Sequence, residues 1–130
     1  MRVLLDTQCW LWMHLDPDRF SERTRRLLVR RDTDLLLSVA SIWEIAIKHG
    51  LGKLRLPEPL ERWVPSRVQL GQTAILSIDA PHAIRVASLP PHHRDPFDRM
   101  IVAQALVEEL PILTADPALR RYEVEVLPAC

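Results

Sequence analysis

The sequence predicts a three-layer α/β fold, in which helices cover both faces of a parallel sheet. Predicted strands alternate with predicted helices along the chain, and the early strands "RVLLD" and "DLLLSV" are continuous apolar runs. Such runs are typical of parallel strands that are buried on both faces. The chain has 130 residues, 48% of them apolar, which suits one compact core, so we expect a single domain over residues 1–130.

Helical spacing and capping residues assign the elements of the first half of the chain. Ser21 is a suitable N-cap for the helix that follows an early turn. Ile42, Ile45 and Ala46 recur at helical spacing, and Gly50 is a natural end for their helix. The predicted elements are a strand over residues 2–6, helices over 7–14 and after Ser21, a strand over 34–39, a helix over 41–52 and helical pieces within the proline-punctuated segment 56–70.

The second half continues the alternation and ends on a strand that has one polar face. Glu123 and Glu125 alternate there with Val124 and Val126, which is typical of a strand at the edge of a sheet. The predicted elements are a strand over residues 73–78, a helix over 80–89, a loop over 90–94, a helix over 97–110, a strand over 111–114, a short helix over 116–121 and the edge strand over 122–127.

The charge balance excludes a protein whose overall positive charge attracts it to nucleic acid. Lys and Arg together number 17, as do Asp and Glu, so the net charge is zero. One segment is nevertheless crowded with arginine, which suits phosphate binding or, as we favour, a solvated helix face. Its members are Arg23, Arg25, Arg26, Arg30 and Arg31.

Cysteine usage and the N-terminal sequence point to the cytoplasm. Cys9 and Cys130 lie near opposite ends of the chain without metal-type spacing, and we interpret both as free thiols. The chain reaches an acid at Asp6, too early for a secretory signal, and no apolar stretch approaches the length of a membrane span. We therefore expect a cytoplasmic protein.

Four acids are predicted to lie at the carboxyl ends of the strands. Asp6 ends the first strand, Glu44 lies early in the helix after the second, Asp98 begins the long helix, and Asp116 follows the strand "PILT". In an open parallel sheet these ends form the ligand crevice, so the four carboxylates converge there if the strands are neighbours.

Each acid also has a purely structural explanation. Asp116 before Pro117 fits an N-cap followed by proline at the first helical position, and Asp6 suits the cap of the first helix. Ser41 and Glu44 stand three residues apart, as in a capping box. Capping is the better explanation of each acid alone, whereas the four together favour a metal site.

The motif "RDPFDRM" contains two aspartates with different predicted roles, one as a helix cap and one as an inward-facing acid. Asp95 before Pro96 fits the helix cap, which makes Asp98 the third helical residue. The positions one and two turns after Asp98 are Ile101, Val102 and Ala105, so Asp98 is predicted to point inward and Asp95 is not. Arg99 is expected on the polar side of the helix, which includes Glu108.

An inward carboxylate near other acids needs a cation. Two like charges about 4 Å apart repel by about 4 kcal/mol at an effective dielectric constant of about 20. Mg²⁺ and Mn²⁺ prefer oxygen ligands and often retain waters and phosphate oxygens. Such an ion lowers the pKa of a bound water and stabilises a leaving oxygen, which suits hydrolysis of phosphodiesters.

Four blocks of the sequence resemble, in order, the signature blocks of PIN-domain ribonucleases, in particular the VapC-type toxins of type II toxin–antitoxin systems. The blocks are "LLDTQCWLW", "SVASIWEIAIKHGLGKL", "HHRDPFDRMIVAQAL" and "ILTADPALRRY". The resemblance implies a sheet of four or five parallel strands and an endoribonuclease that depends on Mg²⁺ or Mn²⁺. The acidic constellation of the family falls on Asp6, Glu44, Asp98 and Asp116, of which Asp6 and Asp98 match the principal metal ligands.

The resemblance also implies partners. VapC-type toxins typically dimerise, cleave a transfer, ribosomal or messenger RNA, and are inhibited by a cognate antitoxin that covers the active-site groove. Tryptophan suits such a protein surface, and it equally suits a core. We expect one or two of the four tryptophans at an interface and the rest inside. They are Trp10, Trp12, Trp43 and Trp63.

Several residues near the acids are candidates for supporting roles. Thr7 is expected to hydrogen-bond near the metal. Lys48 contacts phosphate or pairs with Glu44 one turn away, and the two alternatives stay open. Arg99 and Arg120 suit the RNA backbone or surface ion pairs. The residues interpreted as loop residues outside the site are His92 and His93.

Two other function classes remain as alternatives. A non-catalytic PIN-like module would act through protein or RNA partners, and intact acids in all four blocks argue against it. A phosphotransferase would use Asp6 as a nucleophile. The haloacid-dehalogenase pattern would want an aspartate two residues later, where this chain has Gln8, and many VapC-type relatives have His or Asn there.

Overall fold

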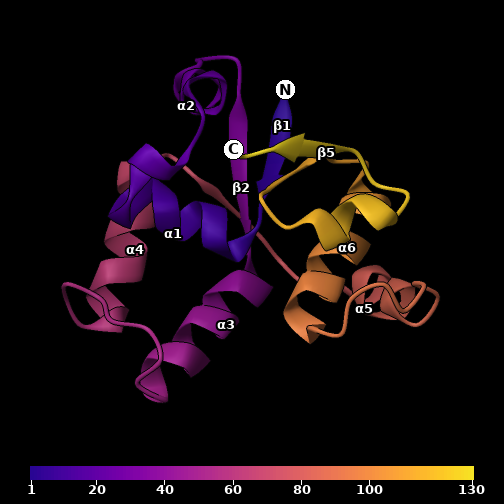
Figure 1. Ribbon diagram of the computed structural model, residues 1–130. Coiled ribbons are helices and arrows are strands. Elements are labelled where there is room, and N and C mark those ends of the chain that lie inside the picture. The colour runs from indigo at the N-terminus through magenta and orange to yellow at the C-terminus, as the bar shows by residue number, and fades with distance from the viewer.

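The computed structural model describes all 130 residues and contains one five-stranded parallel sheet (Figure 1). The strand order is β3-β2-β1-β4-β5, and every neighbouring pair is parallel, which confirms the predicted α/β class. The last strand lies at an edge, as predicted. The strands are β1 (Arg2–Leu5), β2 (Asp34–Ser38), β3 (Ala74–Leu76), β4 (Ile112–Thr114) and β5 (Val126–Pro128).

Helices connect the strands, and Figure 1 shows α1 and α4 on one side of the sheet and α5 and α6 on the other. Ser21 caps α2 as predicted, because its hydroxyl accepts a hydrogen bond from the backbone N–H of Thr24. None of the helices is long and apolar enough to span a membrane. The helices are α1 (Thr7–Leu15), α2 (Glu22–Val29), α3 (Val39–Gly50), α4 (Leu60–Leu70), α5 (Ala80–Val86) and α6 (Pro96–Glu108), with 3-10 turns η1 (Pro17–Arg19) and η2 (Pro117–Arg121).

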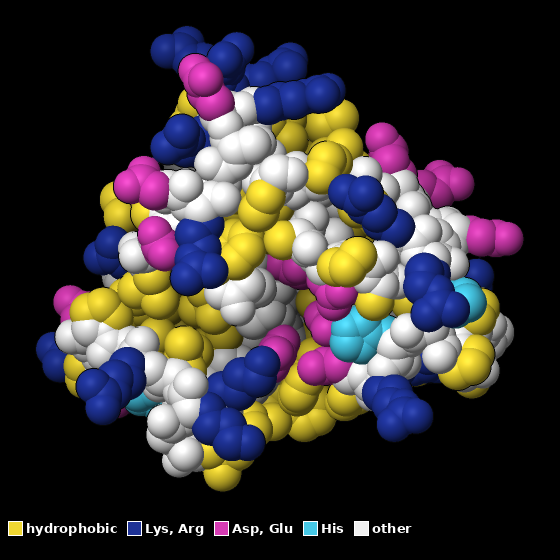
Figure 2. Space-filling model, viewed as in Figure 1, with side chains coloured by type: hydrophobic (Ala, Val, Ile, Leu, Met, Phe, Trp, Pro, Cys, Tyr) yellow, Lys and Arg dark blue, Asp and Glu magenta, His cyan; other side chains and the backbone are white.

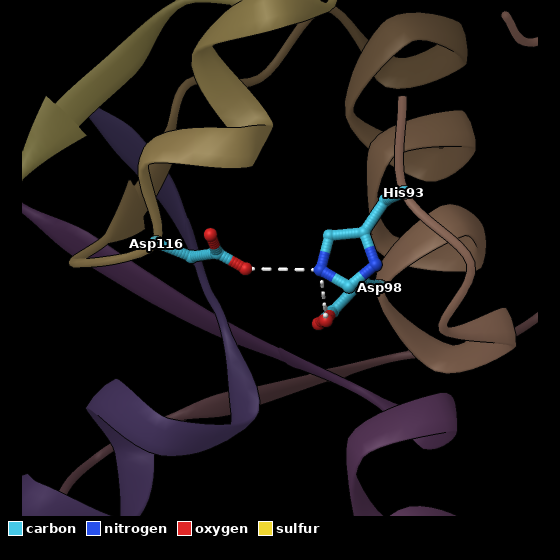
Figure 3. A group of neighbouring side chains, drawn as sticks. All are labelled: His93, Asp98 and Asp116. Atoms are coloured by element: carbon cyan, nitrogen blue, oxygen red, sulfur yellow. Dashed lines mark hydrogen bonds and ion pairs between the residues drawn. The ribbon is translucent and has the colours of Figure 1, made fainter. Parts of the chain in front are cut away.

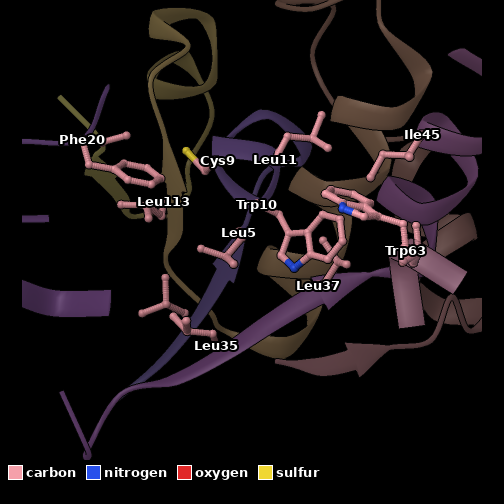
Figure 4. Close-up of a cluster of buried hydrophobic side chains, with 13 residues drawn as sticks. Leu5, Cys9, Trp10, Leu11, Phe20, Leu35, Leu37, Ile45, Trp63 and Leu113 are labelled. Atoms are coloured by element: carbon pink, nitrogen blue, oxygen red, sulfur yellow. The ribbon is translucent and has the colours of Figure 1, made fainter. Parts of the chain in front are cut away.

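The apolar strands divide the core into two clusters, one on each face of the sheet. Leu5 and Leu37 belong to a cluster with Trp10 and Trp63 from α1 and α4 (Figure 4). Leu4, between two residues of that cluster, joins the other cluster, which α6 supplies with apolar side chains. Since successive side chains of a strand point to opposite faces, continuous apolar strands supply both clusters and give the predicted three layers.

Helix α4 is one continuous helix, so the prediction of helical pieces in this segment is wrong. Pro65 lies inside it and lacks the backbone N–H that would complete the hydrogen-bond ladder. A proline in a helix interior costs about 3 kcal/mol relative to alanine. Trp63 and Val64 are both buried in the first core cluster, and this packing offsets the loss.

The C-terminal strand is shorter than predicted. It begins at Val126, so the alternating segment 122–125 precedes it rather than forming it. Tyr122 is buried in the second core cluster, and its hydroxyl accepts a hydrogen bond from the backbone N–H of His93. Burial of the Tyr122 side chain in the core, rather than the alternation of a β-strand, determines the path of residues 122–125.

The tryptophans divide between core and surface. Trp10 and Trp63 are buried, and Trp12 is partly buried against the same cluster. Trp43 is 60% exposed, and its ring packs edge-on against Phe97. The two cysteines are free thiols in the structure.

His14 is a titratable group held within the aromatic part of the core. Its ring centroid lies 4.9 Å from that of Trp10 and 6.2 Å from that of Trp63. Burial, followed by the positive charge of Arg67, lowers the pKa of His14 from 6.5 to about 4. The folded protein therefore holds the neutral imidazole at neutral pH.

This lowered pKa predicts a specific loss of stability in mild acid. Below pH 6.5 the unfolded chain binds a proton at His14 that the folded protein excludes, so the stabilisation is complete above pH 6.5 and is lost toward pH 4. We expect His14→Gln to weaken the pH dependence of the unfolding free energy over this range, measured by urea denaturation. A comparison at pH 8, where the imidazole is neutral in both states, isolates the packing cost of the substitution. Equal slopes for variant and wild type would contradict the assignment.

Candidate metal centre

The carboxyl ends of the central strands open into an acidic cavity of about 510 Å³. Its walls come from the residues that follow β1 and β4, from α3 and from the N-terminus of α6. Figure 2 shows acidic side chains gathered around a hollow near the middle of this face. The structure thus brings the four predicted acids together and adds a fifth. The acidic residues that line the cavity are Asp6, Glu44, Asp95, Asp98 and Asp116.

Asp6 uses one carboxylate oxygen for capping and the other to join two strand ends. Its Oδ1 accepts a hydrogen bond from the backbone N–H of Cys9, which caps α1. Its Oδ2 accepts from the hydroxyl of Thr114 at the end of β4. Burial raises the pKa of this carboxyl, which is 6% exposed. A nucleophilic role for Asp6 has little geometric support, because both oxygens are engaged.

Helix α3 begins earlier than a capping box at Ser41 requires. Its N-cap is Ser38, whose hydroxyl accepts from the backbone N–H of Ala40. The predicted Ser41–Glu44 capping box is therefore wrong, because β2 runs directly into the helix and leaves Ser41 inside its first turn. Glu44 is consequently free to bond outside its own helix.

Glu44 is fixed in the cavity wall by two contacts, one to each carboxylate oxygen. Its Oε1 lies 2.7 Å from the hydroxyl of Thr7, which also bonds Ser41. Its Oε2 pairs with Nζ of Lys48 one turn later. Lys48 therefore adopts the second of its two predicted alternatives, and the pair raises the pKa of the Lys48 ammonium. Thr7 and Lys48 together prevent Glu44 from changing rotamer freely.

The two aspartates of "RDPFDRM" divide their roles as predicted, with one correction. Asp95 is the N-cap of α6, since its Oδ1 accepts from the backbone N–H groups of Phe97 and Asp98. Asp98 is the third helical residue and lines the cavity. The correction is that Asp95 lines the cavity as well. Burial, followed by the charge of Asp95, raises the pKa of Asp98 to about 7.

Asp116 serves as a cap and as a cavity residue with different oxygens. Its Oδ1 accepts from the backbone N–H of Ala118, which caps η2 as the pairing with Pro117 predicted. Its Oδ2 lies 3.0 Å from Nε2 of His93. The capping explanation and the convergence of the acids are thus compatible in the same side chain.

The main residue that sequence reasoning missed is His93, which was placed outside the site. Its Nε2 lies 3.0 Å from Asp116 and 3.1 Å from Oδ2 of Asp98, so its ring stands between the two carboxylates (Figure 3). A histidine two residues before a helix cap, with an acid at the third helical position, was the available signal. His92 next to it packs against Tyr122 instead.

Arg99 supports the loop before α6 and does not form the surface ion pair that was one of its two expected roles. Its guanidinium donates to the backbone carbonyls of Val86, Pro90 and His93. Glu108 instead lies 2.9 Å from Nε2 of the buried His82. Arg99 therefore helps to position the segment that carries His93.

Comparison with known proteins gives this arrangement a family. The sequence model of the PIN-domain family matches residues 3–125 of this chain. The chain belongs to the PIN-domain family. Over 59 residues this PIN domain is 46% identical to Ribonuclease VapC16 of Mycobacterium tuberculosis, a stretch that covers 45% of this chain and 42% of that protein.

Solved structures share the fold over nearly the whole chain. The PIN domain superposes on a chain of VapBC2 from Rickettsia felis bound to a promoter DNA fragment with a TM-score of 0.73 at 15% identity, covering 98% of both chains. For DNA-bound VapBC from Salmonella typhimurium the TM-score is 0.68 at 19% identity, covering 100% of this chain and 99% of that one. At such identities the likeness establishes the fold alone.

The acids of this PIN domain have the composition of a site for a divalent cation. A ring nitrogen of His93 and one carboxylate oxygen from each of Asp98 and Asp116 lie within 4.8 Å of one another. Neither aspartate forms an ion pair with Lys or Arg, although Asp98 is buried enough to hold its proton near neutral pH. Carboxylate oxygens are the ligands that hard divalent cations prefer, and such a cation would neutralise the repulsion.

The division between Asp95 and Asp98 predicts opposite effects of two substitutions. In metal-free protein at pH 8, Asp98→Asn should raise the thermal unfolding temperature, because it removes a partly buried charge that repels Asp95 and Glu44. Asp95→Ala removes the cap of α6 and should lower the free energy of unfolding by about 1 kcal/mol.

Titration calorimetry with Mn²⁺ provides the complementary measurement on the same two proteins. Asp98→Asn should abolish binding, whereas Asp95→Ala should retain it. Undiminished Mn²⁺ affinity in Asp98→Asn would show that Asp98 is not a ligand.

Proposed function

We propose that this PIN domain is a VapC-type endoribonuclease, the toxin of a type II toxin–antitoxin system, and that it hydrolyses RNA phosphodiester bonds with Mg²⁺, for which Mn²⁺ can substitute. The observation that carries the proposal is the convergence of Asp6, Glu44, Asp98 and Asp116 on one open cavity. The identity to a ribonuclease over 59 residues supports the same activity.

The residues of the chain would divide the work as follows. Asp98 and Asp116 would hold the cation together with Asp6, which lines the same cavity. When bound, the cation supplies a water of lowered pKa and neutralises charge on the phosphodiester. Glu44, fixed by Thr7 and Lys48, would orient the attacking water from the wall of α3. No covalent intermediate on the protein is required.

Lys53 is the cavity cation available to the RNA backbone. Lys48 is already paired with Glu44, whereas Lys53 lines the same cavity, is exposed and forms no ion pair. An ammonium in this position suits a phosphate of the bound strand. Arg99 would support the site through the loop that it holds.

We also propose a cognate antitoxin and a homodimer as the protein partners. Trp43 and Phe97 line a largely apolar cavity of about 410 Å³ between α3, α5 and α6, beside the acidic cavity. The solved relatives are VapBC complexes, which supports an antitoxin for this chain. Size-exclusion chromatography after co-expression with a small adjacent reading frame would measure both associations.

The activity is tested with purified protein and fluorophore-labelled single-stranded RNA. We expect cleavage that requires added Mg²⁺ or Mn²⁺ and that is reduced at least 100-fold in Asp98→Asn, because the ligand is lost. Lys53→Ala should raise KM with little change in kcat, since it removes a contact made equally in the ground state and the transition state. Lys48→Ala, which frees Glu44, should lower kcat instead.

The same preparations separate the enzyme from a non-catalytic PIN-like module. A module without turnover would show no metal-dependent cleavage and would bind Mn²⁺ weakly. If Asp98→Asn cleaves RNA as fast as wild type, the assignment of Asp98 to the active site is wrong. Sequencing RNA 5′ ends after induction in cells would then identify the RNA.

A further inference from the structure

The backbone and ring of His93 are held in place by three contacts from different parts of the chain. Its backbone N–H donates to the Tyr122 hydroxyl at 2.9 Å, and its carbonyl accepts from the Arg99 guanidinium. The ring Nδ1 lies 3.0 Å from the backbone nitrogen of Asp95. A loop residue with this many restraints is positioned before any ligand arrives.

The contacts also determine which way the ring faces. Nε2 points between Oδ2 of Asp98 and Oδ2 of Asp116, as Figure 3 shows. Turning the ring by half a rotation about its bond to Cβ would place a carbon against the Asp95 N–H and move Nε2 away from both carboxylates. Both sets of contacts are satisfied only in the observed orientation.

The partner of Nδ1 decides where the ring carries its proton. The Asp95 backbone N–H can only donate, so Nδ1 must present its lone pair and carries no hydrogen. The single proton of the neutral imidazole is then on Nε2, where it faces two acceptors. A second proton on Nδ1 would oppose the Asp95 N–H at 3.0 Å.

A nitrogen that carries a proton has no free lone pair for a metal. For Nε2 to bind the cation, the proton would have to move to Nδ1, where it would face the Asp95 N–H. That change would break the contact between the ring and the start of α6. His93, Asp98 and Asp116 lie within 4.8 Å of one another, but this proximity does not make His93 a metal ligand.

We propose that His93 is a positioning residue: as the neutral Nε2–H tautomer it donates to Asp98 and Asp116, holds their carboxylates at the spacing that a divalent cation needs, and does not itself bind the cation. This inference rests on the proposed function only for the presence of the cation. Hydrogen-bond donors that orient metal ligands commonly contribute 10–100-fold to metal affinity.

The tautomer is measured directly by two-bond ¹H–¹⁵N correlation NMR on protein labelled at histidine nitrogens, at pH 8 with saturating Mg²⁺. The pattern separates a protonated ring nitrogen from an unprotonated one, and the spectrum of His93→Ala identifies the His93 signals by their loss. We expect a protonated Nε2 and an unprotonated Nδ1. An unprotonated Nε2, or a protonated Nδ1, would overturn the proposal.

Calorimetry with Mn²⁺ gives the second measurement. His93→Ala should weaken binding about 10–100-fold. His93→Gln, whose amide N–H can reach the same two carboxylates, should recover most of the affinity. His92→Phe is the matched control, because it keeps an aromatic ring against Tyr122 and should leave binding unchanged. Equal affinities for His93→Ala and wild type would contradict a positioning role.

These outcomes are distinguishable from a failure of the proposed function. A protein that shows the expected tautomer and Mn²⁺ affinities but cleaves no RNA would retain the inference and lose the ribonuclease. Thermal unfolding of each variant without metal separates a loss of positioning from a loss of fold, since a variant that melts like wild type has kept its structure.

Discussion

The capping of helix N-termini by acids at one edge of the sheet is the constraint on which the site depends. Asp6 starts α1, Asp95 starts α6 and Asp116 starts η2, each through hydrogen bonds to backbone N–H groups. The positive end of a helix dipole stabilises the first two carboxylates in their places. These bonds set where each helix begins and, by the same contacts, where the remaining carboxylate oxygens point.

The sheet provides the second part of this arrangement. Because β1 lies between β2 and β4, residues that follow the first and fourth strands become neighbours although more than a hundred positions separate them in the sequence. The hydrogen bond from Thr114 to Asp6 joins these two strand ends directly. Core clusters on both faces keep the strands in register, so the cavity rests on a rigid part of the molecule.

Local rules predict those features of the site that depend on residues close in sequence. The helical position of Asp98 follows from the Asp95–Pro96 cap three residues earlier. The alternation of strands and helices along the chain predicts a parallel sheet, and this predicts that the acids meet at the carboxyl ends of the strands. The spacing of His93 before the cap is a local signal, but it does not predict where the ring points, because the hydroxyl of the distant Tyr122 holds its backbone. The continuous helix through Pro65 escaped prediction for a similar reason, since tertiary packing of Trp63 outweighs local propensity.

The double engagement of Asp6 has a practical consequence for anyone who needs this protein in an inert form. Its carboxylate joins the start of one helix to the end of another strand, so neutralising it disturbs the scaffold as well as the cavity. Asp98 caps nothing, because Asp95 performs that task for the same helix. To empty the candidate metal site while leaving the scaffold intact, the side chain to alter is therefore Asp98, which the architecture does not use.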